Sequence, residues 1–111
     1  MNVNQKDLVL LPYPFTNFEG TKVRPAIIIS NNSFNKISDD CLMVPLTTVI
    51  KDEPFSIFVE QKDLASGKLL QKSRVRADKI FCVEKRLILM KIGVLNDNTF
   101  DKVKQEINKI F

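Results

Sequence analysis

The chain has 111 residues, of which 44% are hydrophobic and 27% charged, with a formal net charge of +4. This length predicts one domain, residues 1–111, with a sizeable core. No apolar run approaches the roughly 20 residues of a membrane span, and an acid near the start argues against a signal peptide. With no histidine and two cysteines, a zinc site and a disulfide framework are not expected. Cys41 and Cys82 lie in apolar stretches and are expected to be buried thiols in a reducing cytosol.

Short apolar or alternating segments separated by turn residues predict six strands. Their expected ranges are 8–11, 26–30, 41–47, 55–60, 69–83 and 87–95. Proline has no backbone donor, so Pro12 is expected to end the first strand and Pro45 to mark an edge or bulge in the third. Residues 63–67 are expected to form a turn region.

The last segment changes its hydrophobic period from two to between three and four. Phe100, Val103, Ile107 and Ile110 therefore predict a C-terminal helix, which Asn96 or Asn98 would cap. Its apolar stripe is expected to pack on the strands. Several short strands and one terminal helix predict a mainly β fold, either a strongly bent antiparallel sheet or a small barrel.

Basic residues are concentrated between positions 68 and 79, where Asp78 is the single acid among Lys68, Lys72, Arg74, Arg76 and Lys79. On a continuous strand, Arg74, Arg76 and Asp78 would share one face, because side chains alternate with a period of two. Such a row fits a polyanionic partner. A solvated face or a plain surface ion pair explains the same pattern.

Arg24 stands directly before Pro25 and a run of aliphatic residues. Proline pushes the preceding residue toward extended geometry, so Arg24 is expected at the mouth of a buried strand with its guanidinium near the rim. There it would either contact a phosphate or lie along the apolar strand. Thr47 and Thr48 end the third predicted strand, where they are either site residues or ordinary strand-end residues.

Three ordered blocks, at residues 22–30, 44–48 and 75–80, resemble the MazF/PemK toxins of type II toxin–antitoxin systems, as do residues 6–16 and 91–95. The resemblance implies a small SH3-like, plasmid-maintenance-toxin β-barrel with a C-terminal α-helix and short helical segments. It implies a cytoplasmic homodimer whose partner is a cognate acidic antitoxin. It also implies sequence-specific cleavage of single-stranded RNA, often messenger RNA, by 2′-hydroxyl attack, with no metal or other cofactor.

The same resemblance carries catalytic roles to four positions. Asp78 matches the carboxylate assigned as base in some members, and Arg76 matches an arginine assigned as acid or phosphate stabiliser. Arg24 and Thr47 match the arginine and threonine central in other members. Because arginine is a poor proton donor, electrostatic stabilisation is its expected role. The expected RNA-binding residues are Phe15, Glu19, Lys22, Thr48, Arg74 and Lys79, and loops 15–22 and 51–53 are expected to influence which bases are read.

Two other functions fit the same pattern. The first is a non-enzymatic toxin of the same barrel class, similar to the gyrase poisons, which would act through its C-terminal helix. The second is a nucleic-acid-binding barrel without catalysis.

Overall fold

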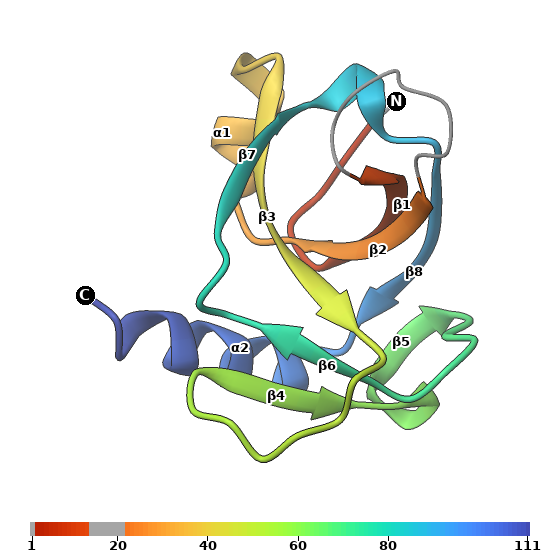
Figure 1. The fold of residues 1–111 in the computed structure, drawn as a ribbon. Coiled ribbons are helices and arrows are strands. Elements are labelled where there is room, and N and C mark those ends of the chain that lie inside the picture. The colour runs from red at the N-terminus through yellow and green to blue at the C-terminus, as the bar shows by residue number, and fades with distance from the viewer. Residues whose placement is uncertain (1, 14–21) are drawn as a thin grey trace.

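The computed structural model describes residues 2–13 and 22–111, and it is mainly β (Figure 1). Seven strands of one antiparallel sheet follow the order β4-β6-β3-β2-β1-β8-β5, and β7 pairs with β3 off this path. The strands are β1 (Asp7–Tyr13), β2 (Lys22–Ile28), β3 (Asp40–Thr47), β4 (Ser56–Val59), β5 (Leu64–Gly67), β6 (Ser73–Arg76), β7 (Phe81–Glu84) and β8 (Met90–Leu95). The helices are α1 (Asn32–Ile37) and α2 (Asp97–Asn108), with single 3-10 turns at Gln61–Asp63 and Lys85–Leu87. The predicted mainly β, barrel-like class with a C-terminal helix is confirmed.

Strands β1 and β3 and the second half of β2, from Ala26, are covered on both faces, which explains their nearly continuous apolar sequences. Alternate residues enter two separate core clusters. Val9 and Ile28 belong to one cluster, and their chain neighbours Leu8 and Ile27 belong to the other. The sheet therefore curls around one core while its other face packs against α2.

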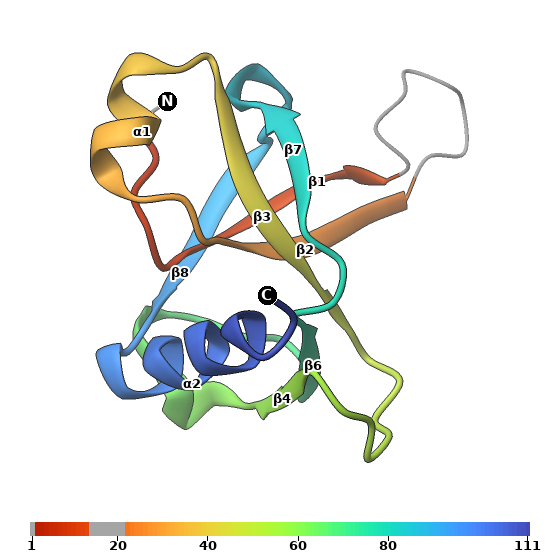
Figure 2. The same cartoon turned by 90° about the vertical axis from the view of Figure 1, so that its left-hand side faces the viewer.

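Helix α2 lies across the half of the sheet that contains β4 and β6 (Figure 2). Its predicted apolar stripe is confirmed for Phe100 and Val103, which are buried, and for Ile107, which packs against the same cluster. Ile110 lies beyond the end of the helix and is 42% exposed. Asn96 is the N-cap, and its side chain accepts a hydrogen bond from the backbone N–H of Thr99 at 2.7 Å.

Three prolines lie inside strands, each at a point where its strand lacks one neighbour. Pro12 pairs with Val23 on one side, but β8 pairs only with Asp7–Leu10 of β1. The β2–β3 ladder begins at Ala26, one residue after Pro25. The prediction that Pro12 ends the first strand is therefore wrong, because a missing donor costs nothing where no partner strand is present.

Pro45 occupies the position where β3 changes partners. The strand β7 pairs with β3 as far as Met43, and β6 pairs with β3 from Leu46 onward. Pro45 falls in the gap between these two ladders. The expectation of an edge-like position is confirmed.

The predicted long strand over 69–83 is broken in two. Strand β6 ends at Arg76, Ala77 and Asp78 form a turn, and β7 begins at Phe81. The break lets β6 pair with β4 and with the end of β3 at Leu46 and Thr47. Strand β7 pairs with the first half of β3, Asp40–Met43.

Two other predictions also need correction, the turn region at 63–67 and the burial of Cys82. Residues 64–67 form β5 rather than a turn. Helix α1 follows its N-cap Asn31 and is a short helical segment of the kind that the resemblance implied. Cys41 is buried, and this burial raises the pKa of its thiol to about 11. Cys82 is exposed, because β7 covers the core with only one of its faces.

Among the residues described, no helix has the length and apolar character needed to cross a membrane.

Candidate functional site

Three strands that are distant in sequence bring the predicted catalytic residues to one rim of the sheet. In the β2–β3 ladder Ala26 pairs with Pro45, so continuing the register by two residues aligns Arg24 with Thr47. Thr47 in turn pairs with Arg74 of β6. Because β6 runs antiparallel to β3 and Val75 pairs with Leu46, Arg76 falls beside Pro45, two residues before the end of β3.

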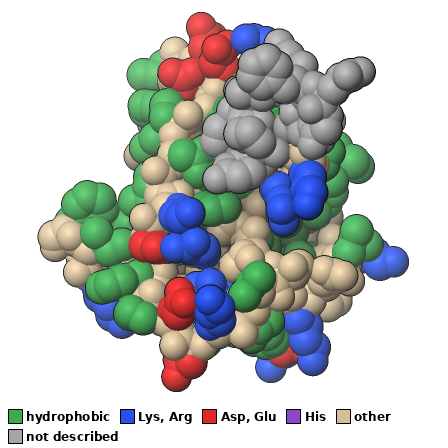
Figure 3. All heavy atoms as spheres, viewed as in Figure 1, with side chains coloured by type: hydrophobic (Ala, Val, Ile, Leu, Met, Phe, Trp, Pro, Cys, Tyr) green, Lys and Arg blue, Asp and Glu red, His purple; other side chains and the backbone are tan. Residues whose placement is uncertain are grey.

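A shallow pocket of about 190 Å³ lies at this rim. Its lining contains Arg24, Thr47, Arg76 and Lys79, together with Pro45 and Leu46. Three cations and one hydroxyl therefore face a common space. Arg24 is exposed and forms no ion pair with any other described residue. Figure 3 shows Lys and Arg side chains on the face viewed in Figure 1, with hydrophobic side chains among them. The arrangement is suited to a phosphate group and to charge that builds up on it.

Asp78 lies beside the pocket and is held by Arg76. Arg76 donates from Nη2 to Oδ2 at 2.8 Å and from Nε to Oδ1 at 3.3 Å, which is a bidentate pair. These hydrogen bonds from Arg76, with its positive charge, lower the pKa of the Asp78 carboxyl against a smaller opposing effect of burial. Asp78 is thus a carboxylate at neutral pH and fixes the plane of the Arg76 guanidinium.

Thr47 ends β3, and its hydroxyl is oriented by the chain that follows. Its Oγ1 accepts a hydrogen bond from the backbone N–H of Val49 at 3.1 Å. The hydroxyl hydrogen remains available to donate toward the pocket. Thr48 does not line this pocket; it lines the neighbouring groove.

Arg74 is nearly buried, with a side chain 7% exposed, whereas Lys22, Thr48 and Lys79 are exposed. Its Nε donates to the carbonyl oxygen of Val49 at 3.3 Å, and its Nη1 lies 3.5 Å from Oε2 of Glu53. Arg74 and Arg76, which were predicted to lie in one row, therefore have different surroundings. Arg76 lines the pocket, whereas Arg74 is directed toward the chain between β3 and β4.

Among the predicted RNA-binding residues that the structure describes, Lys79 alone lines the pocket. Lys22 is exposed at the start of β2 and lies outside it. Phe15 and Glu19 lie outside the described residues.

An apolar groove of about 590 Å³ adjoins the pocket at Arg24, and sequence reasoning did not identify it. Leu10 of β1 pairs with Pro25 of β2 and with Met90 of β8, so these side chains share one outer face of the sheet. Val23 and Leu70 also line the groove and are 51% and 79% exposed. The available sequence signal was an apolar Val23 between the charged residues Lys22 and Arg24, but strand pairing decides which other residues line the groove.

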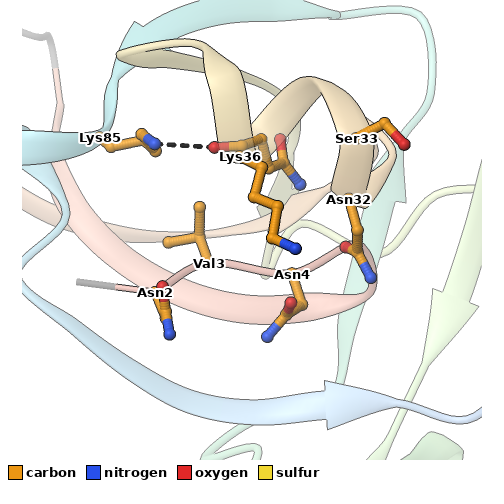
Figure 4. Close-up of a pocket in the computed structure, with 8 residues that line it drawn as sticks. Asn2, Val3, Asn4, Asn32, Ser33, Lys36 and Lys85 are labelled. Carbon is orange, nitrogen blue, oxygen red and sulfur yellow. Dashed lines mark hydrogen bonds between the residues drawn. The ribbon is translucent and has the colours of Figure 1, made fainter.

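A separate hollow of about 360 Å³ lies between α1 and the N-terminal segment (Figure 4). Asn2, Asn4 and Asn32 line it, together with Lys36 and Lys85. The ammonium of Lys85 donates to the backbone oxygen of Asn35 at 2.7 Å. Of the predicted site residues within 2–13 and 22–111, none borders this hollow. Across residues 2–13 and 22–111, no group of three or more His, Cys, Asp or Glu side chains is arranged to hold a metal ion.

Comparison with solved structures supports the same fold. An endoribonuclease in complex with its cognate antitoxin from Mycobacterial species is 20% identical, with a TM-score of 0.78, covering 96% of this chain and 92% of that one. The Mycobacterium tuberculosis toxin MazF-mt6 is 17% identical, with a TM-score of 0.75 and 93% of both chains covered. A MazE-MazF structure from Deinococcus radiodurans is 18% identical, with a TM-score of 0.81, covering 99% of this chain and 96% of that one.

Comparison with curated proteins gives no match. The family model described as PemK-like, MazF-like toxin of type II toxin-antitoxin system matches residues 4–111, nearly the whole chain. The match includes all three strands that form the pocket. The chain therefore belongs to the family of PemK-like, MazF-like toxins of type II toxin–antitoxin systems.

Proposed function

We propose that this chain is an endoribonuclease toxin that cuts single-stranded RNA, without a metal, through attack of a ribose 2′-hydroxyl on the adjacent phosphate. The observation that carries the proposal is the pocket in which Arg24, Thr47, Arg76 and Lys79 converge from separate parts of the chain. Relatives of the same fold include proteins described as endoribonucleases.

The reaction needs positive charge around a phosphorane-like transition state, a base for the 2′-hydroxyl and a proton for the leaving oxygen. Arg24, Arg76 and Lys79 would surround the phosphate, and the Thr47 hydroxyl would donate to one of its oxygens. The bond from the 2′-oxygen to phosphorus forms while the bond to the 5′-oxygen breaks. The products are a 2′,3′-cyclic phosphate and a 5′-hydroxyl end, the latter after the 5′-oxygen takes up a proton.

Asp78 is the candidate acceptor of the 2′-hydroxyl proton. The lowered pKa that follows from its pairing with Arg76 keeps Asp78 ionised but makes it a weak base. Most of the rate enhancement would then come from the cations that stabilise developing charge, and Asp78 would also orient Arg76.

The test is incubation of the purified protein with a long RNA in EDTA, followed by analysis of the cut ends. The proposal expects fragments with 2′,3′-cyclic phosphate ends and much slower cutting by Arg24→Ala and Asp78→Asn. Absence of cutting, or equal cutting by both variants, would contradict it. If the protein bound RNA without cutting it, a nucleic-acid-binding barrel would be favoured. If it were toxic without binding RNA, a non-enzymatic toxin would be favoured.

The proposed protein partners are a second copy of this chain and an acidic antitoxin, with both acting in the cytoplasm. The apolar groove beside Arg24 exposes Val23 and Leu70, and covering these side chains would favour a homodimer. The cations of the pocket suit the acidic tail of an antitoxin. A monomeric mass at micromolar protein, unchanged in Leu70→Glu, would count against the homodimer.

A further inference from the structure

The chain between β3 and β4, residues 48–55, leaves the sheet next to the pocket and carries Thr48 at its start. Val49 and Ile50 in this segment are 54% and 51% exposed. Burial in the hydrophobic core therefore does not fix their position. The far end of the segment is held where the Ala77 N–H donates to the Phe55 carbonyl at 3.0 Å and Ser56 Oγ donates to the Glu53 carbonyl at 2.7 Å. Two further hydrogen bonds shape the part nearer to Thr47. The backbone N–H of Val49 donates to Thr47 Oγ1 at 3.1 Å, and that of Glu53 donates to the carbonyl of Lys51 at 3.1 Å.

One buried side chain connects this segment to the sheet at two points. Arg74 pairs across the strands with Thr47, and its guanidinium extends past the end of β3. There its Nε donates to the Val49 carbonyl at 3.3 Å, and its Nη1 lies 3.5 Å from the Glu53 carboxylate. The planar fork of arginine allows both contacts at once, which a lysine ammonium would not reproduce in the same geometry.

We propose that Arg74 is a positioning residue, which holds the chain after Thr47 in place so that the Thr47 hydroxyl and Thr48 keep their positions at the candidate site. Arg74 does not contact RNA. The inference rests on the proposed function only for its catalytic consequence. An RNA phosphate would have to draw the Arg74 guanidinium away from Val49 and Glu53 and out of a site where 7% of the side chain is exposed.

The two roles of Arg74 predict opposite effects of Glu53→Gln. If Arg74 binds RNA, the Glu53 carboxylate competes with phosphate, and its removal tightens RNA binding. If Arg74 positions the segment, Glu53→Gln weakens that hold and slows cleavage, while RNA affinity keeps its dependence on salt. A phosphate contact by Arg74 would appear as a salt slope that falls by about 0.7 in Arg74→Met.

The first measurement is hydrogen exchange of a peptide covering residues 48–55, which needs no RNA. Exchange should be about tenfold faster in Arg74→Met and about threefold faster in Glu53→Gln, with no further increase when both changes are combined. The matched control is Arg86→Met, which removes an arginine from an exposed pair with Glu84, joined at 2.6 Å. Unchanged exchange in both Arg74→Met and Glu53→Gln would overturn the proposal.

The second measurement uses RNA in EDTA. At saturating RNA, Arg74→Met should cut about tenfold more slowly, because a small displacement of Thr47 weakens its bond to the phosphate. Arg74→Lys should recover little of this loss. Binding of a fully 2′-O-methylated single-stranded RNA, which cannot be cut, should keep its salt slope in Arg74→Met.

Glu53 also lies 3.8 Å from the exposed Lys51, so Glu53→Gln is compared in the presence and absence of Arg74. A lowered salt slope in Arg74→Met, or tighter RNA binding by Glu53→Gln that is lost when Arg74→Met is added, would overturn the positioning role. If the unaltered protein failed to cut RNA, the proposed function would fail. Hydrogen exchange and the salt slope would still decide whether Arg74 holds the segment or binds RNA.

Discussion

The two ends of strand β6 place similar side chains in different surroundings. Arg76 lies at the pocket end, where its guanidinium lines an open hollow and pairs with Asp78, 37% exposed. Arg74 lies two residues earlier and is covered by the chain after β3, where it meets Val49 and Glu53. The same residue type on the same strand therefore faces an open cation-lined site at one end and a closed internal contact at the other.

This difference shows that strand periodicity alone does not decide what an arginine contacts. Period-two geometry directs Arg74 and Arg76 to the same side of β6, with Val75 buried between them on the opposite side. The chain that follows β3 covers the guanidinium of Arg74, whereas the guanidinium of Arg76 lines the open pocket. Substitutions at the two ends should accordingly affect different properties, catalysis at Arg76 and the stability of the β3–β4 segment at Arg74.

The largest expected effect is on cleavage at the pocket end. Arg76→Ala should reduce RNA cutting in EDTA by about 10²–10³-fold, because a preorganised donor to the transition state is lost. Arg76→Lys should retain more activity, since it keeps the charge and loses the bidentate geometry. Single-turnover rates at saturating RNA measure both. If Arg76→Ala cut RNA as fast as the unaltered protein, Arg76 would not be a catalytic residue.

The next effect is on stability at the opposite end of β6. Arg74→Met should lower the free energy of unfolding by about 1–2 kcal/mol, because it removes the side-chain donor to the Val49 carbonyl and one of the two cations beside Glu53. Arg76→Met should cost less than about 1 kcal/mol, since its ion pair is partly exposed. Urea unfolding of both variants measures the comparison. A larger loss in Arg76→Met would reverse the roles assigned to the two ends.

A smaller effect concerns pH and the Arg76–Asp78 pair. The pKa of Asp78 is lowered in the folded protein, so its contribution to stability is complete above the unfolded pKa and is lost as pH falls through the folded one. The stability difference between the unaltered protein and Asp78→Asn should be constant above about pH 5 and shrink below about pH 4. Thermal unfolding from pH 3 to 7 measures it, and a difference that grows on acidification would contradict the pairing.

The smallest effect is expected at Lys22, an exposed cation outside the pocket. If Lys22 contacts RNA, Lys22→Gln should lower the salt slope of RNA binding by about 0.7 without changing the rate at saturating RNA. Lys62→Gln, which removes an exposed lysine from the turn Gln61–Asp63, is the matched control. If the salt slope is unchanged in Lys22→Gln, Lys22 does not contact RNA.

Several features could be predicted because they depend on local chemistry. The 3.6-residue period and Asn96 define α2, and continuous apolar runs identify the central strands buried on both faces. Pro45 correctly indicated a local edge, because it lies between the β6 and β7 ladders on β3. Pro12 was harder to interpret, because it lies inside β1 only where the ladder with β8 has ended, which no local pattern reveals.

Local patterns in the sequence are enough to predict the mainly β class, the C-terminal helix and the residue types that a phosphate site would need. Those features follow from side-chain periodicity, capping and charge, which act over a few residues. Long-range strand pairing brings Arg24, Thr47 and Arg76 to one pocket and turns Arg74 away to Val49 and Glu53. That choice depends on the register of β2, β3 and β6 and on the break after Arg76, which arise from pairing between distant segments.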